Sequence, residues 1–273
     1  MAETSQEVMA TLGFSEPLPV RMKYHANDTS QDVMNVVPHD VPIGNARTWG
    51  VAPSLDVEGF TLVRHRSAVT DWRDAEQVAA VHNDEIRRLL LDLTGADDVE
   101  IRGVGILRFG EKSTDSGALN NSRPARFVHI DVSDATAATF NARSPLAQGR
   151  KVVRVAQYNV WRAISPPPQD VPLALCDARS IAPDDLIFAD AVFDRDGVPL
   201  FSFEGLVLRH NPQQRWGYFR DMGPDEALVF KTNDSDPARA HHVPHGAFDD
   251  PSVPPETPPR SSIEMRGAAY WYE

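Results

Sequence analysis

Residues 127–132 read Phe127-Val128-His129-Ile130-Asp131-Val132, and this short stretch is the strongest indication of the fold. β-branched and aromatic residues dominate it, which is typical of a β-strand. Side chains two positions apart on a strand project from the same face, so His129 and Asp131 would point together. An imidazole and a carboxylate on one face can hold one metal ion. A hydrogen-bonded pair of strand residues is the alternative interpretation.

A second His-x-Asp pattern, His82-Asn83-Asp84, lies in a different setting. Apolar residues recur at helical spacing between residues 74 and 93, acidic residues crowd the first turn, and Gly95 supplies a stop. On a helix, positions i and i+2 diverge by roughly 200°, so this pair would not share one ligand. We therefore expect His82 to be a surface residue of the helix.

Most of the chain after residue 95 shows strand patterns. Short segments rich in β-branched and aromatic residues alternate with turn sequences such as Asp196-Gly197 and Asn211-Pro212. About eight strands at this spacing predict a mainly β protein, a double-sheet jelly roll with flanking helices. The expected strands lie near residues 99–107, 127–132, 152–158, 186–192, 204–209, 217–219, 228–231 and 263–271, with another candidate at 59–63.

We expect a single domain spanning residues 1–273. Residues 1–58, rich in Pro, Asn and Asp, predict an irregular N-terminal segment that wraps around the core. Residues 59–126 would supply the helix and the first strands, and residues 127–273 the metal-binding β core. With 41% hydrophobic residues, the chain can bury a substantial core.

Charge and cysteine content narrow the class of protein. A formal net charge of −12 argues against nucleic acid or an anionic membrane surface as the main partner. The single cysteine, Cys176, has no intrachain partner for a disulfide, which favours a cytoplasmic location. The sequence shows no signal-peptide pattern and no membrane span. We expect a soluble protein with a small-molecule substrate, and residues 270–272 suit a homodimer contact as well as the core.

Three histidines near the C-terminus, His241, His242 and His245, are candidates for a further ligand. The spacing of His241 and His245 would form a zinc pair on a helix, but Pro244 interrupts such a helix. Two histidines and one carboxylate are the ligand set of a mononuclear iron(II) oxygenase, which leaves positions for dioxygen and a co-substrate. A structural role is more common for a lone histidine, and the residues alone leave the choice among the three open.

The segment Arg260-Ser261-Ser262-Ile263-Glu264-Met265-Arg266 is the most discriminating of all. Read as a strand, it gathers four polar residues on one face: Arg260, Ser262, Glu264 and Arg266. Two arginines pointing into a barrel would bury two charges, which is costly unless an anion meets them. A dicarboxylate such as 2-oxoglutarate suits an arginine clamp of this kind. The alternative is a solvated strand face with an Arg–Glu ion pair.

Several motifs in one order resemble a known family of non-haem iron oxygenases. That family includes the hydroxylase component of cephalosporin 7α-methoxylase, gibberellin desaturase-like proteins and a meroterpenoid endoperoxide synthase. The resemblance covers most of the chain after Leu55. The matching stretches are residues 93–96, 128–131, 159–162, 172–177, 215–219, 225–231, 244–248 and 260–266. Ala163, where the family commonly has proline, and residues 231–235 depart from its pattern.

The resemblance implies a double-stranded β-helix with iron held by His129, Asp131 and His245. The spacing of Arg260 and Arg266 is similar to that of the nucleic-acid demethylase branch of the superfamily. There the first arginine holds the distal carboxylate of 2-oxoglutarate and the second contacts its keto-acid end. We therefore expect Fe(II), 2-oxoglutarate and O2 as cofactors, with Ser262 lying beside the two arginines.

The resemblance implies a 2-oxoglutarate-dependent dioxygenase that hydroxylates, desaturates or otherwise oxidises a small specialised metabolite. Candidates for its substrate wall are Trp161, Arg162, Trp216 and Tyr218, although large aromatic residues more often serve packing. One alternative is a metalloenzyme on the same barrel, an oxidase or isomerase, that does not use 2-oxoglutarate. Another is a non-catalytic jelly-roll binding module, which failure to bind iron would favour. The substrate and the fate of its oxidised carbon are not readable from the sequence.

Overall fold

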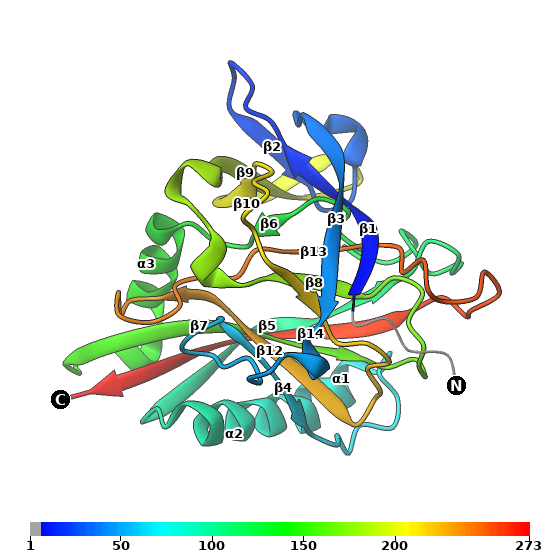
Figure 1. The fold of residues 1–273 in the computed structure, drawn as a ribbon. Coiled ribbons are helices and arrows are strands. Elements are labelled where there is room, and N and C mark those ends of the chain that lie inside the picture. The colour runs from blue at the N-terminus through cyan, green and yellow to red at the C-terminus, as the bar shows by residue number, and fades with distance from the viewer. Residues whose placement is uncertain (1–6) are drawn as a thin grey trace.

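Two β-sheets dominate the computed structural model, which describes residues 7–273 (Figure 1). Among these residues, the larger sheet contains, in spatial order, the strands β1 (Glu7–Ser15), β3 (Val36–Asn45), β11 (Trp216–Tyr218), β8 (Leu173–Cys176), β13 (His245–Ala247), β6 (His129–Ile130), β10 (Val198–Leu208), β9 (Leu186–Arg195) and β2 (Met22–His25). The smaller sheet contains β4 (Phe60–Arg64), β12 (Glu226–Asp234), β7 (Val152–Ala163), β14 (Ser261–Tyr272) and β5 (Asp98–Phe109).

The two sheets pack face to face around a shared apolar core. Phe60 of β4, Trp161 of β7 and Phe230 of β12 belong to one buried cluster with Leu175 of β8, which comes from the opposite sheet. Most neighbouring strands are antiparallel, and the exceptions are the parallel pairs β3–β11 and β2–β9. The predicted mainly β jelly roll is therefore confirmed.

One helical segment covers the outer face of the smaller sheet, as Figure 1 shows for α2. It comprises α1 (Ala75–Gln77), a π-helical turn (Val78–His82) and α2 (Asn83–Thr94). Asp74 caps its start, and Gly95 ends it in the left-handed conformation with φ of 63°. Ile86 and Leu90 are fully buried against the sheet. The predicted helix is confirmed, with the π turn as a local addition.

His82 is not on the surface of this helix, contrary to the sequence-based expectation. Its side chain is 1% exposed and lies beside Trp72, with ring centroids 5.0 Å apart. The Nδ1 atom is 2.8 Å from a carboxylate oxygen of Glu85. The π turn shifts the helical register, so the residue faces the chain that packs beside the helix rather than solvent.

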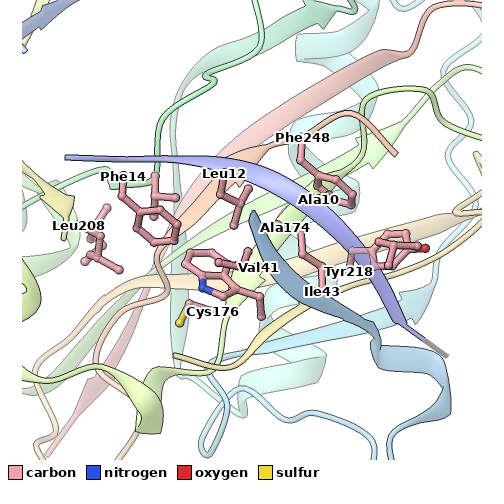
Figure 2. Close-up of a cluster of buried hydrophobic side chains, with 14 of the residues drawn as sticks. Ala10, Leu12, Phe14, Val41, Ile43, Ala174, Cys176, Leu208, Tyr218 and Phe248 are labelled. Atoms are coloured by element: carbon pink, nitrogen blue, oxygen red, sulfur yellow. The ribbon is translucent and has the colours of Figure 1, made fainter. Parts of the chain in front are cut away.

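Residues 7–58 are less irregular than expected, because they contribute the three strands β1, β2 and β3 to the larger sheet. β1 and β3 form an antiparallel pair, called the outer hairpin below although β2 lies between them in the sequence. Figure 2 shows their side chains gathered with those of central strands. The buried positions of β1 alternate along the strand: Val8, Ala10, Leu12 and Phe14. Two prolines inside β3 made a strand hard to predict there from the sequence. They are tolerated because the hairpin lies at the sheet edge. Residues 1–6 of the predicted segment fall outside the described residues.

The remaining elements agree with the sequence in position more than in length. The predicted strands are present, several are longer than expected, and the strand around His129 is only two residues long. The sequence interpretation missed the short strands β8 and β13 and the helix α3 (Asp134–Arg143). Short 3-10 turns complete the structure at Thr29–Gln31, Ala46–Thr48, Pro145–Ala147, Ala178–Ser180 and Pro183–Asp185.

Two smaller observations concern the predicted partners. Tyr270 is fully buried within the chain itself, so it is a core residue and presents no surface to a second copy. In the described part of the chain, no helix combines the length and the apolar character needed to cross a membrane.

Candidate active site

The three predicted metal ligands lie close together in the folded chain. His129 lies on β6, Asp131 follows that strand directly, and His245 opens β13. β13 pairs antiparallel with β6 so that His245 and His129 are directly opposite, with ring centroids 4.3 Å apart. One ligand atom from each residue lies within 4.8 Å of the others. Such a group can hold a metal ion.

Backbone carbonyls orient both imidazoles. His129 Nδ1 lies 3.1 Å from the carbonyl oxygen of Phe127, and His245 Nδ1 lies 3.1 Å from that of Val243. With the ring proton on Nδ1, the Nε2 lone pair is free to bind a metal. Burial, reinforced by the charge of His245, lowers the pKa of His129 to about 4. Burial also lowers the pKa of His245. Both rings are therefore neutral at pH 7, as ligation requires.

The carboxylate of Asp131 is held from two sides. The Nδ2 group of Asn159 donates a hydrogen bond of 2.6 Å to Oδ2, and Arg266 Nη2 lies 3.4 Å from Oδ1. Burial alone would raise the pKa of Asp131, but the charge of Arg266, the two histidines and the hydrogen bond from Asn159 together outweigh it, so the pKa lies below its ordinary value. The group is an ionised ligand held in a defined orientation. Arg266 also pairs with Glu264 at 3.2 Å.

The two histidines and Arg260 line one narrow cavity of about 20 Å³. Its polar lining is formed by His129, His245, Arg108, Glu264 and Arg260, with Trp161 among the apolar residues. The side chain of Arg260 is 1% exposed, and its Nη1 donates to the carbonyl of Val171 at 2.7 Å. Among the described residues, its buried Nε has no hydrogen-bond partner. Burial lowers the pKa of Arg260 to about 9. A buried cation with a free N–H suits an anionic ligand.

The other two predicted cofactor residues have different surroundings. The Ser262 hydroxyl lies 3.4 Å from the carbonyl oxygen of Arg108, and Ser262 does not line the narrow cavity. Arg266 reaches Asp131 and Glu264 rather than that cavity. Arg260 precedes β14, so the predicted shared strand face does not extend to it. A bulge in the pairing of β14 with β5 lies between Glu264 and Arg266.

Two wider cavities lie on either side of Asp131, Phe203 and Arg266, which line both. The first has a volume of about 260 Å³ and also contains His129, Tyr24 and Arg108. The second has a volume of about 450 Å³ and is lined by the β7 face that carries Asn159. His129 and Asp131 are therefore accessible to a small molecule from the first wide cavity, and Asp131 from the second as well.

Of the four predicted substrate residues, only Trp161 lies in a cavity next to the candidate ligands. Arg162 projects from the other face of β7 and donates to the carbonyl oxygens of His65 and Pro224. Strand alternation explains the difference, because consecutive residues point to opposite faces. Trp216 packs edge-on against Phe14, and Tyr218 against Phe248, in the outer cluster of the larger sheet; their contacts are those of packing residues (Figure 2).

The neighbouring histidines do not join the group. His241 Nε2 lies 2.6 Å from Asp134, and its Nδ1 lies 2.8 Å from the carbonyl oxygen of Asp234. His242 is in contact with His241, with ring centroids 4.7 Å apart.

Sequence reasoning missed Tyr24, Arg108 and Asn159. Asn159 was detectable, because a polar residue two positions from Trp161 on an apolar strand shares its inward face. Arg108 directly follows the predicted strand at residues 99–107, and nothing in the sequence shows where its side chain points. Tyr24 reaches the site only because β2 pairs in parallel with β9, far away in the chain.

The chain is similar over almost its whole length to proteins of known class. A family model described as "Oxidoreductase/YMDC permease-like domain" matches residues 11–270. The chain is 30% identical over 271 residues to the Fe(II)/2-oxoglutarate-dependent dioxygenase nvfI of Aspergillus novofumigatus, a match that covers 95% of this chain and 92% of the relative. The chain belongs to the non-haem Fe(II)/2-oxoglutarate oxygenase family.

Further relatives of this oxygenase agree with that membership. The hydroxylase/desaturase CTB9 of Cercospora beticola is 30% identical over 236 residues, covering 80% of this chain and 72% of the relative. A solved structure of the iron and alpha-ketoglutarate-dependent endoperoxidase NvfI, in a different conformation, superposes with a TM-score of 0.84 at 25% identity, covering 100% of each chain. The family resemblance inferred from the sequence motifs is confirmed.

Proposed function

We propose that this oxygenase hydroxylates, desaturates or otherwise oxidises a small specialised metabolite with Fe(II), 2-oxoglutarate and O2. One observation carries the proposal: three metal-ligand candidates lie together, and the two histidines among them line a cavity that is also lined by a buried, incompletely paired arginine. The printed names of the relatives, which include dioxygenases and hydroxylase/desaturases, support the same chemistry.

We assign His129, Asp131 and His245 as the iron ligands. The donor set fits the metal, because both imidazoles are neutral with Nε2 free and the carboxylate is ionised. When bound, iron(II) and 2-oxoglutarate supply the oxidation of a substrate C–H bond by dioxygen, with succinate and carbon dioxide as by-products. Asn159 and Arg266 would hold Asp131 in the orientation that ligation needs.

We assign Arg260 to the distal carboxylate of 2-oxoglutarate. The buried guanidinium offers a free Nε in the lining of the narrow cavity, where a dicarboxylate would neutralise it. Trp161 lies near this guanidinium, with 5.5 Å between the arginine carbon and the ring centroid, and would shield the ion pair from water. Arg266 is assigned to Asp131 rather than to the keto acid, and Ser262 to the support of β5.

A cytoplasmic location belongs to the proposal as well. It rests on the one cysteine of the chain, Cys176, which is buried and free, and whose pKa burial raises to about 12, so that it is an unreactive thiol.

Anaerobic titration of the metal-free protein with iron(II), and then with 2-oxoglutarate, tests the assignment. We expect a weak visible charge-transfer band in the wild type. His245→Ala should abolish it, and Arg260→Gln should require much more 2-oxoglutarate to reach the same band. His39→Ala, a change in the outer hairpin, is the matched control and should behave as the wild type.

Two other results would each point elsewhere. Tight iron binding without a band would favour a metalloenzyme that does not use 2-oxoglutarate. No iron binding by the wild type would favour a non-catalytic binding module on the same fold.

A further inference from the structure

Arg108 is the charged residue of the site that the proposed function leaves without a role. It lies near the end of β5, and its side chain lines both the narrow cavity and the first wide cavity. Nη1 donates to Asn121 Oδ1 at 3.2 Å and to the carbonyl oxygen of Arg123 at 2.6 Å. These bonds fix one edge of the guanidinium. Within residues 7–273, Nε and Nη2 have no hydrogen-bond partner and the group forms no ion pair.

The balance of charge around the candidate ligands leaves one cation over. Three guanidinium groups, those of Arg108, Arg260 and Arg266, meet two carboxylates, those of Asp131 and Glu264. Other charges nearby balance: Glu111 pairs with Arg126, and Asp170 lies 4.0 Å from Lys112. Asp32 and Arg123, which line the first wide cavity, add one charge of each sign. Iron(II) and the 2-oxoglutarate dianion would cancel each other. The surplus positive charge therefore persists in the loaded site.

This surplus runs against the character of the whole protein, whose formal net charge is −12. Partly burying a guanidinium without an anion beside it is unfavourable. A ligand that supplies the anion would offset this desolvation penalty. The free edge of Arg108 presents two N–H groups in parallel, which match the two oxygens of a carboxylate.

Four aromatic residues form part of the wall of the cavity beside Arg108. Tyr24 and Phe127 lie with ring centroids 4.9 Å apart, and Phe193 and Phe203 with centroids 5.3 Å apart, all four lining the same space. Its volume of about 260 Å³ lies near the lower end of small-molecule sites, roughly 300–1,000 Å³. Four arginines line the cavity, of which Arg126 and Arg266 are held in ion pairs. An aromatic wall next to a cation without an ion pair suits a molecule that has an apolar body and an anionic group.

We propose that the substrate of this oxygenase is an organic acid, an apolar small molecule whose carboxylate pairs with Arg108 while its body lies against the aromatic wall. The inference rests on the proposed function and names the substrate class for it. Arg108 would then be a substrate-binding residue that orients the molecule relative to His129 and Asp131, which line the same cavity.

The test compares acids with uncharged matches of the same shape. Aryl- and alkyl-substituted acetates, among them 2-naphthylacetate, and their primary amides are titrated anaerobically into the protein loaded with iron(II) and 2-oxoglutarate. Binding is followed by calorimetry and by the shift of the charge-transfer band. We expect at least one acid to bind about tenfold or more tightly than its amide, and Arg108→Gln to remove that preference.

Arg123→Gln is the matched control, because Arg123 lines the same cavity and the substitution removes the same charge. It should leave the preference for the acid in place. The affinity for 2-oxoglutarate should change little in Arg108→Gln, and circular dichroism should show an intact fold. Arg108→Lys, which keeps the charge, covers the case in which the glutamine variant does not fold, and it should retain part of the preference.

Three outcomes would overturn the inference: no acid in the panel binding more tightly than its amide, the preference surviving Arg108→Gln, or that variant losing affinity for 2-oxoglutarate rather than for the acid. The last would make Arg108 a cofactor residue. Failure of the proposed function looks different, because the wild type would then show no charge-transfer band at all, while calorimetry would still report whether the acid binds.

Discussion

Asn159 and Arg266 are cross-strand partners on β7 and β14, and both reach the same carboxylate, that of Asp131. Neither is a candidate metal ligand. Both determine where the ligand oxygen lies, because a carboxylate held by two donors loses its freedom to rotate away. Their positions show how the smaller sheet supports a ligand set that comes entirely from the larger sheet.

Asn159→Ala should weaken iron(II) binding by about 10–100-fold, the usual cost of losing a hydrogen bond to a metal ligand. The fold should be intact, because only one side-chain bond to Asp131 is removed. Gln157→Ala is the control, since Gln157 lies on the same face of β7 but bonds to Ala137 and Asn141 instead. Iron titrations of the two variants compare them directly, and equal affinities would show that the Asn159 bond does not support the ligand.

His82 illustrates a second effect at the scale of single residues. Burial lowers its pKa to about 4, despite the opposing hydrogen bond to Glu85. The unfolded chain takes up the proton as the pH falls below about 6.5, whereas the folded protein does not until about pH 4. Folding stability contributed by the neutral ring is therefore lost as the pH falls through that window.

The free energy of unfolding, measured in urea at pH 7 and pH 5, should fall less in His82→Gln than in the wild type. The expected difference between the two decreases is about 2 kcal/mol, from about 1.4 kcal/mol per pH unit below the ordinary histidine pKa. The variant is expected to be less stable than the wild type at pH 7, so only the change with pH is informative. Identical decreases would mean that His82 takes up its proton equally in both states.

At the scale of elements, the hairpin of β1 and β3 depends on one close approach. The carbonyl oxygen of Gly13 accepts a hydrogen bond of 2.8 Å from the backbone N–H of Val128, and Gly13 bridges to Phe127, beside the strand that carries His129. A Cβ atom at position 13 would lie 2.6 Å from the carbonyl oxygen of Arg126. Backbone cannot move aside as a flexible side chain can, so glycine is required there.

Gly13→Ala should destabilise the protein by about 1–3 kcal/mol, the range for overpacking a tight contact. Gly50→Ala is the matched control, because a Cβ at that position meets nothing within 4 Å. Thermal or urea unfolding measures both. Equal stability of the two variants would mean that the hairpin shifts away at little cost.

At the scale of the whole molecule, the N-terminal segment holds both edges of the larger sheet. β1 and β3 lie at one edge and β2 at the other, and the hairpin buries an apolar cluster with strands β6, β8, β10 and β11. Figure 1 shows β2 and most of β1 and β3 on the side of the molecule opposite α2. The chain thus has apolar clusters on the outer face of each sheet in addition to the shared core.

These connected clusters lead us to expect one cooperative unfolding transition for residues 1–273, as the single-domain prediction requires. Far-ultraviolet circular dichroism and tryptophan fluorescence should report the same midpoint. Deleting residues 1–45 should abolish the cooperative transition, because it uncovers an apolar cluster and leaves unpaired strand edges. A shortened chain that melts at the midpoint of the full chain would contradict this account.

Local residue patterns were sufficient for much of the candidate site. His129 and Asp131 share a face through strand alternation, the helix before Gly95 follows from its apolar spacing, and the family motifs indicated His245. Patterns of this kind can be recognised in the sequence because they depend on residues only a few positions apart. The same alternation, applied to residues 161 and 162, would have separated Trp161 from Arg162.

The sequence by itself determined the class of fold, the residue types of the candidate metal ligands and the family. Only the tertiary structure decided which side chains surround the ligands. Tyr24 lies at the site because β2 pairs in parallel with β9. Arg108 lies at the site because the end of β5 places its side chain in the lining of two cavities. Arg266 meets Asp131 across 135 residues of chain. Such contacts arise from long-range packing, in which the partners have no fixed separation in sequence and therefore leave no periodic trace in it.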